Sequence, residues 1–208
     1  MTTSLDCDTA RKDNAWRFFL LTVGFEAGLA TLAFAIGWLV DFNPLATWNW
    51  SLSDLGWTLL ATLPLLAALW MMDRHPIGPL VQLRQLVQDV VIPLFRGMKL
   101  WQLGTIALAA GVGEETLFRG LLQGGVSTLL ARWASPSAAV ACALGLASLL
   151  FGLAHFLSKT YALLCFFMGL YLGAVWLATG NLLVPVVVHG LYDFLALVYL
   201  LRVGEREA

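Results

Sequence analysis

The chain has 208 residues, of which 60% are hydrophobic and only 12% are charged. A soluble domain carries about 25% charged residues, so this composition excludes an ordinary soluble protein and predicts a polytopic membrane protein. The formal net charge is −1. A net charge near zero indicates no basic surface, so we expect no nucleic-acid partner. The apolar composition instead predicts that a lipid bilayer surrounds the chain.

Six segments are apolar over the length of about 20 residues that a helix needs to cross a bilayer. The predicted spans are residues 17–40, 55–72, 100–123, 138–157, 161–179 and 182–201. The connections between the last three are short, which predicts antiparallel neighbours. The expected fold class is therefore all-α, a polytopic membrane helical bundle with about six transmembrane helices.

The stretch 79–99 has a different pattern from the spans. It repeats apolar residues at helical spacing, such as Leu80, Leu83 and Val87, among polar residues such as Arg84 and Gln88. This alternation predicts one interfacial amphipathic helix that lies on the membrane surface.

The positive residues predict an orientation. If the spans are right, one side of the membrane receives Arg11, Lys12, Arg17, Arg74, Arg84, Arg96, Lys99, Lys159, Arg202 and Arg206. Only Arg132 falls on the other side, and Arg119 lies within a span. Because cytoplasmic loops carry an excess of Lys and Arg, both termini are predicted to be cytoplasmic.

The third span contains Glu114, Glu115 and Arg119. A charge at the bilayer centre costs at least about 2.5–3.5 kcal/mol, so three of them need a reason. Glu115 and Arg119 are four residues apart on one helix face and can pair. Glu114 is rotated by about 100° and has no equally good partner, which suits a general base. A structural Glu–Arg clamp is the alternative, but it leaves Glu114 unexplained.

Two histidines lie within later spans. Phe151 and His155 are in the fourth span, and His189 and Asp193 are in the sixth. Asp193 is one turn from His189, so its carboxylate can orient the ring or itself join the site. By the predicted spans, His155 lies nearer the cytoplasmic end than Glu114, by more than a hydrogen bond can bridge.

Two glutamates and two histidines are compatible with two mechanisms. They fit zinc ligation, and they equally fit direct activation of water by a glutamate. Glu26 stands alone in the first span. We expect it to serve helix packing, and the alternative is contact with the site or a water-filled crevice.

Three ordered motifs carry a family resemblance: Glu-Glu-x-x-x-Arg at 114–119, Phe-x-x-x-His at 151–155 and His-x-x-x-Asp at 189–193. With them the chain resembles the CAAX protease and bacteriocin-processing family (CPBP, also called Abi) of intramembrane endopeptidases, and is CAAX prenyl protease 2-like. Eukaryotic members remove the last residues of prenylated CAAX proteins. The resemblance covers roughly residues 101–200.

The resemblance implies roles for individual residues. Glu114 would activate the attacking water, and Glu115 and Arg119 would orient it and balance charge. His155 and His189 would stabilise the oxyanion or hold a metal together with Glu114 or Asp193. Many members have Asn where this chain has Asp193. The family is described both as metal-dependent, with zinc or another divalent metal, and as metal-independent, so both cofactor alternatives stay open.

The resemblance also implies an organisation and a setting. Residues 1–99 would form an N-terminal tail, two spans and the interfacial helix, residues 100–201 a catalytic four-helix membrane core, and residues 202–208 a short tail. We expect an integral protein of the bacterial inner (plasma) membrane with a membrane-associated protein or peptide substrate.

The predicted function is an intramembrane endopeptidase that hydrolyses a peptide bond with glutamate-activated water. The alternative is a non-proteolytic membrane protein of the same fold, acting in bacteriocin immunity or as a binding or regulatory partner. A small transporter with a proton relay is disfavoured, because the two halves of the chain show no inverted repeat.

Overall fold

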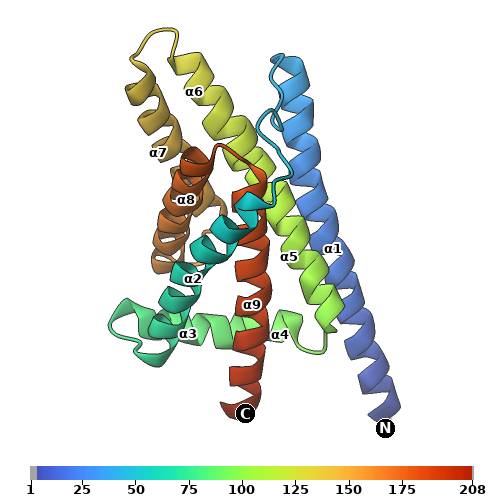
Figure 1. Cartoon of the computed structure of the whole chain (residues 1–208). Helices are drawn as coiled ribbons and strands as arrows, with labels where there is room; N and C mark the ends of the chain where they lie inside the picture. The colour runs from blue at the N-terminus through green and yellow to red at the C-terminus, as the bar shows by residue number, and fades with distance from the viewer. Residues whose placement is uncertain (1–3, 208) are drawn as a thin grey trace.

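The computed structural model describes residues 4–207 of the chain, and the side chains of residues 14–204. Its helices, in which η marks a π-helical segment, are α1 Ser4–Leu39, α2 Ser53–Arg74, α3 Pro79–Leu86, η1 Val87–Val91, α4 Ile92–Phe95, α5 Leu100–Glu115, η2 Thr116–Gln123, α6 Gly124–Leu130, α7 Pro136–Ala154, α8 Lys159–Thr179 and α9 Leu183–Glu207. No strand occurs in residues 4–207. The predicted all-α membrane bundle is confirmed (Figure 1).

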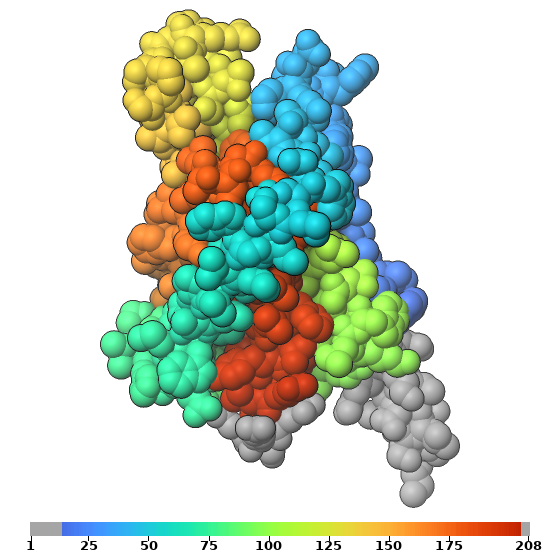
Figure 2. All heavy atoms as spheres, viewed as in Figure 1, coloured from blue at the N-terminus to red at the C-terminus, as the bar shows by residue number. Residues whose placement is uncertain are grey.

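Five helices in the described residues are long and apolar enough to cross a membrane. They are Asn14–Leu39, Ser53–Arg74, Pro136–Ala154, Lys159–Thr179 and Leu183–Gly204. Many of their large apolar side chains face outward, as expected for lipid contact; Leu21, Trp38, Leu60 and Phe167 are all more than half exposed. In the view of Figure 2, α2 covers part of α9. The chain is an integral membrane protein.

The remaining predicted span, 100–123, corresponds to three elements that follow one another without a break. Helical backbone runs through α5, η2 and α6 from Leu100 to Leu130, and Figure 1 shows it crossing the bundle beside α1. The central part, Thr116–Gln123, is π-helical. Such segments are rare and occur frequently at functional sites.

Two helix ends differ from the predicted ones and change the relative depth of the polar residues. The third helix continues past 123 to Leu130, which adds about 10 Å at a rise of 1.5 Å per residue. The fourth helix, α7, ends at Ala154, and His155 is its C-cap. Because α7 therefore descends from a point farther along the bundle, His155 reaches the depth of Glu114. The expected separation of these two residues was wrong. At the C-terminus, α9 also continues beyond the predicted end at 201 to Glu207.

The loop 40–52 between α1 and α2 folds back onto the bundle. Trp176 Nε1 donates to Thr47 Oγ1 over 3.0 Å, and the Leu182 amide donates to the Thr47 carbonyl. Asn181 Nδ2 donates to the Asn49 carbonyl and to Asp54 Oδ2, at 2.8 and 2.7 Å. Irregular backbone is tolerated inside a membrane protein where such protein contacts satisfy its polar groups. The loop is thereby tied to the turn between α8 and α9.

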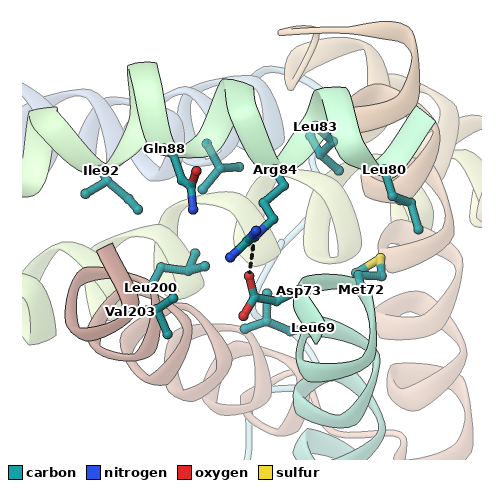
Figure 3. A pocket seen from close by; sticks show the side chains of 11 residues that line it. Leu69, Met72, Asp73, Leu80, Leu83, Arg84, Gln88, Ile92, Leu200 and Val203 are labelled. Carbon is teal, nitrogen blue, oxygen red and sulfur yellow. Dashed lines mark hydrogen bonds and ion pairs between the residues drawn. The ribbon is translucent and has the colours of Figure 1, made fainter. Parts of the chain in front are cut away.

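The amphipathic stretch forms α3, η1 and α4, which together lie across the end of the bundle where both chain ends are found (Figure 1). Its apolar side chains face α2 and α9 across a small pocket of about 80 Å³ (Figure 3). Asp73 on α2 fastens this arrangement. Arg84 Nε lies 3.1 Å from Asp73 Oδ1, and the Tyr199 hydroxyl donates to Asp73 Oδ2 over 2.7 Å.

Asp73→Ala is expected to lower the free energy of unfolding by about 1–2 kcal/mol, because it removes a partly buried ion pair and one further hydrogen bond. Thermal unfolding of the detergent-solubilised protein measures the change. Asp89→Ala is the control, since it removes an exposed carboxylate from the amphipathic stretch that packs on Asp73. Equal unfolding temperatures for the Asp73 variant and the wild type would contradict the fastening role.

Candidate functional site

Glu115 is the centre of a buried polar cluster. Its side chain is fully buried, and its Oε1 atom accepts hydrogen bonds from two sides. Arg119 Nη1 donates from one turn later on the same helix, and His189 Nδ1 lies on the facing helix α9, each at 2.9 Å. The pairing expected from the four-residue spacing is therefore present, and it extends to a histidine from another helix.

Arg119 has contacts beyond Glu115. Its Nη2 donates to the main-chain carbonyl of Gly169 on α8 over 3.0 Å. Its guanidinium carbon lies 4.6 Å from the centre of the Phe151 ring, a favourable cation–π arrangement. The side chain is 1% exposed. Arg119 thus connects α8, the end of α7 and its own helix around one positive charge.

Glu114 points to a different helix from its neighbour Glu115. Its Oε2 atom lies 3.5 Å from His155 Nε2 and is buried without a hydrogen-bond partner. The other ring nitrogen, His155 Nδ1, lies 2.8 Å from the Phe151 carbonyl. Since a carbonyl only accepts, Nδ1 carries hydrogen and Nε2 is the nitrogen that exchanges a proton with Glu114.

His189 lies between two carboxylates. Its Nδ1 contacts Glu115, and its Nε2 lies 3.4 Å from Asp193 Oδ2. Both ring nitrogens thus face groups that only accept when ionised, so the ring is satisfied as an imidazolium. Asp193 is one turn beyond His189, as the sequence spacing requires.

Close helix approach brings these groups together. A Cβ atom on Gly111 of α5 would lie 2.5 Å from the Val186 carbonyl oxygen and 3.1 Å from the Gly190 nitrogen of α9. Only glycine allows this approach of the two backbones. It occurs one turn before Glu115 and directly beside His189, and so it sets their 2.9 Å contact.

Phe151 joins the two histidines. Its ring is stacked on the His155 ring with centroids 4.6 Å apart, and it meets the His189 ring edge-on at 5.9 Å. Phe118 contacts its far side at 5.1 Å. The ring is 1% exposed. Phe151 therefore contacts both imidazoles and helps to fix their orientation.

The cluster has one open side. The side chains of His155 and Asp193 are 25% and 31% exposed, whereas those of Glu115, Arg119 and His189 are at most 3% exposed. The exposed edge of the cluster is therefore formed by His155 and Asp193, and the buried Glu114 lies beside His155. The ion pair behind it is shielded from solvent.

The donor set does not fit a metal centre as it is arranged. The described residues contain no group of three or more His, Cys, Asp or Glu side chains that converge on one point as metal ligands. His155 and His189 instead direct their nitrogens to different carboxylates.

All six residues named from the sequence lie in or beside this cluster: Glu114, Glu115, Arg119, His155, His189 and Asp193. The sequence predicted a packing role for Glu26 and missed that its buried side chain lies close enough to the polar cluster to interact with it. Its side chain is 7% exposed, and it interacts electrostatically with Glu114, His189, Asp193 and His155. The one signal in the sequence was a lone carboxylate in an apolar span.

Comparison with known proteins supports a family assignment. Residues 96–195 match the family described as type II CAAX prenyl endopeptidase Rce1-like. The matched segment begins just before α5, contains all six candidate residues, and ends within α9. No curated protein and no solved structure gives a significant match to this chain. The resemblance predicted from the three motifs is confirmed.

Proposed function

Since residues 96–195 match the family described as type II CAAX prenyl endopeptidase Rce1-like, we propose that this chain hydrolyses a peptide bond of a membrane-associated substrate with water activated by Glu114. One observation carries the proposal. Glu114 is a buried carboxyl group with a partnerless oxygen, 3.5 Å from a histidine on the accessible edge of the site.

Glu114 would act as the general base. A water bound at its Oε2 atom loses a proton to the carboxylate as its oxygen attacks the carbonyl carbon of the peptide bond. His155 lies beside the same oxygen and is held by the Phe151 carbonyl. Its role is to orient Glu114 and to stabilise its negative charge before the substrate binds.

His189 would stabilise the oxyanion of the tetrahedral intermediate. Glu115 fixes the ring from its Nδ1 side, so that Nε2 with its hydrogen faces Asp193, whose side chain is 31% exposed. The contact of Nε2 with Asp193 is the longer one, at 3.4 Å, and an oxyanion can compete for this donor. A preorganised donor in a site with little water contributes strongly to transition-state stabilisation.

Arg119 and Glu115 would support the site without contacting the substrate. Both side chains are at most 1% exposed, and the guanidinium also holds the Gly169 carbonyl of α8. Glu115 Oε1 accepts two hydrogen bonds, and its side chain is 0% exposed. Glu114 instead lies beside His155, whose side chain is 25% exposed, and this position favours Glu114 for the proton transfer.

The proposed function is tested with the purified protein in liposomes. The probe is a peptide that ends in a prenylated CAAX sequence, and the same peptide without the prenyl group is its control. We expect release of the C-terminal tripeptide, identified by mass spectrometry. Cleavage of both peptides would keep the peptidase function and remove the requirement for the lipid group.

The non-proteolytic alternative predicts a different result. A binding or immunity protein of this fold would cleave neither peptide and would keep its cellular effect in the Glu114→Gln variant. If membranes incubated with the wild type and with Glu114→Gln show the same peptide termini by mass spectrometry, the peptidase proposal is wrong.

A further inference from the structure

Glu26 is a buried carboxyl group that the proposed mechanism does not use. It lies in the middle of α1, its side chain is 7% exposed, and its Oε2 atom is buried without a hydrogen-bond partner. None of the ion pairs among the described residues involves it. Burying a polar group without a partner costs free energy, and burying an unpaired charge costs far more.

The backbone places Glu26 next to Glu114. A Cβ atom on Gly113 would collide with the Glu26 main-chain carbonyl oxygen and would lie 3.3 Å from its Cα. α1 and α5 therefore touch at the residue that precedes Glu114, and Figure 1 shows the two helices side by side. The contact places the Glu26 main chain against the residue before Glu114, and the Glu26 carboxyl lies within electrostatic range of the catalytic groups.

The charged groups that act on Glu26 come from all the elements around it. They are Glu114 of α5, His189 and Asp193 of α9, and His155 at the end of α7. One of them, Glu114, is a carboxylate whose neighbour Gly113 contacts the Glu26 main chain. Two carboxyl groups that share a site do not both ionise readily, so one of the two keeps a proton.

The balance of charges in the cluster indicates which of the two carboxyl groups, Glu26 or Glu114, keeps the proton. The cluster has four carboxyl groups, Glu26, Glu114, Glu115 and Asp193, and three groups that can be cationic, Arg119, His155 and His189. Each carboxylate other than Glu26 faces a cationic partner within 3.5 Å. Glu26 faces none, so the carboxyl that keeps the proton is Glu26.

We propose that Glu26 is a further catalytic residue, which holds a proton in the resting protein and delivers it to the amide nitrogen of the peptide bond. This inference rests on the proposed peptidase function. Glu114 takes one proton from water as the oxygen bonds to the carbonyl carbon. When the carbon–nitrogen bond breaks, the electron pair stays on nitrogen, which takes the proton of Glu26. The proton on Glu114 then passes to Glu26 and restores the resting state.

The test uses Glu26→Gln, which keeps the size and polarity of the side chain but has no carboxyl proton to transfer. Cleavage of the prenylated CAAX peptide is expected to fall about 10²-fold, at the lower end of the range for general acid–base catalysis. Thr22→Val, one turn earlier on α1 with a hydroxyl bonded to the Phe18 carbonyl, is the matched control and should cleave as the wild type does.

A second measurement does not depend on activity. Infrared spectroscopy of the reconstituted protein should show the carbonyl stretch of a protonated carboxylic acid, which is lost in Glu26→Gln and kept in Thr22→Val. An unchanged band in Glu26→Gln would overturn the resting protonation.

The two measurements separate this inference from the proposed function. If Glu26→Gln cleaves as fast as the wild type while Glu114→Gln is inactive, the peptidase function stands and the role of Glu26 is wrong. If the wild type cleaves nothing, the transfer step falls together with the proposed function, and the infrared band still decides whether Glu26 holds a proton.

Discussion

Glu114→Gln is expected to lower kcat/KM for the prenylated peptide by about 10³-fold or more, since general-base catalysis contributes about 10²- to 10⁴-fold. The amide of glutamine occupies the same space but cannot accept the proton of water. Glu114 Oε2 accepts no hydrogen bond, and its one close charged neighbour is His155 Nε2 at 3.5 Å. The variant should therefore stay folded with at most a small change in unfolding temperature, and the loss should be in activity.

Two further variants sharpen this test. Glu114→Asp keeps the carboxylate but withdraws it from His155 by one methylene group, so partial activity is expected. Thr105→Val changes a half-buried residue of the same helix, whose hydroxyl donates to the Trp101 carbonyl, and should retain full activity. Cleavage by purified Glu114→Gln at the wild-type rate would remove Glu114 from the chemistry.

The sequence predicted those features of the fold and site that depend on local spacing. Long apolar segments gave the helices, because a spanning helix needs about 20 apolar residues and satisfies its backbone internally. The four-residue intervals of Glu115 with Arg119, and of His189 with Asp193, predicted contacts that the structure contains. A helix brings such residues to one face whatever surrounds it.

Features that depend on contacts between helices could not be read from spacing. The contact of Glu114 with His155 depends on where two helices end, and apolar composition alone placed both ends wrongly. The π-helical turn after Glu115 leaves no signal in the pattern of apolar residues. The position of Glu26 beside the cluster depends on which residue of α1 contacts Gly113 of α5. This contact joins segments that are far apart in the chain.

Arg119→Leu is expected to lower the free energy of unfolding by about 3–5 kcal/mol, the cost of leaving one partner of a buried ion pair uncompensated. The variant removes the donor to Glu115 Oε1 and the donor to the Gly169 carbonyl, at 2.9 and 3.0 Å. It also removes the cation above the Phe151 ring. Denaturant unfolding of the protein in mixed micelles measures the loss.

Arg119→Lys tests geometry separately from charge. A lysine keeps the positive charge but has no planar fork, so it cannot hold Glu115 and Gly169 together in the same way. We expect a stability between those of the wild type and Arg119→Leu.

The double variant Glu115→Gln with Arg119→Leu tests the cause of the loss. If the cost comes from the unpaired Glu115 charge, neutralising that charge should recover part of it, so that the double variant is more stable than Arg119→Leu alone. A double variant less stable by the sum of the two single changes would contradict this account. It would show that the two residues stabilise the bundle independently, through His189 for Glu115 and through α8 for Arg119.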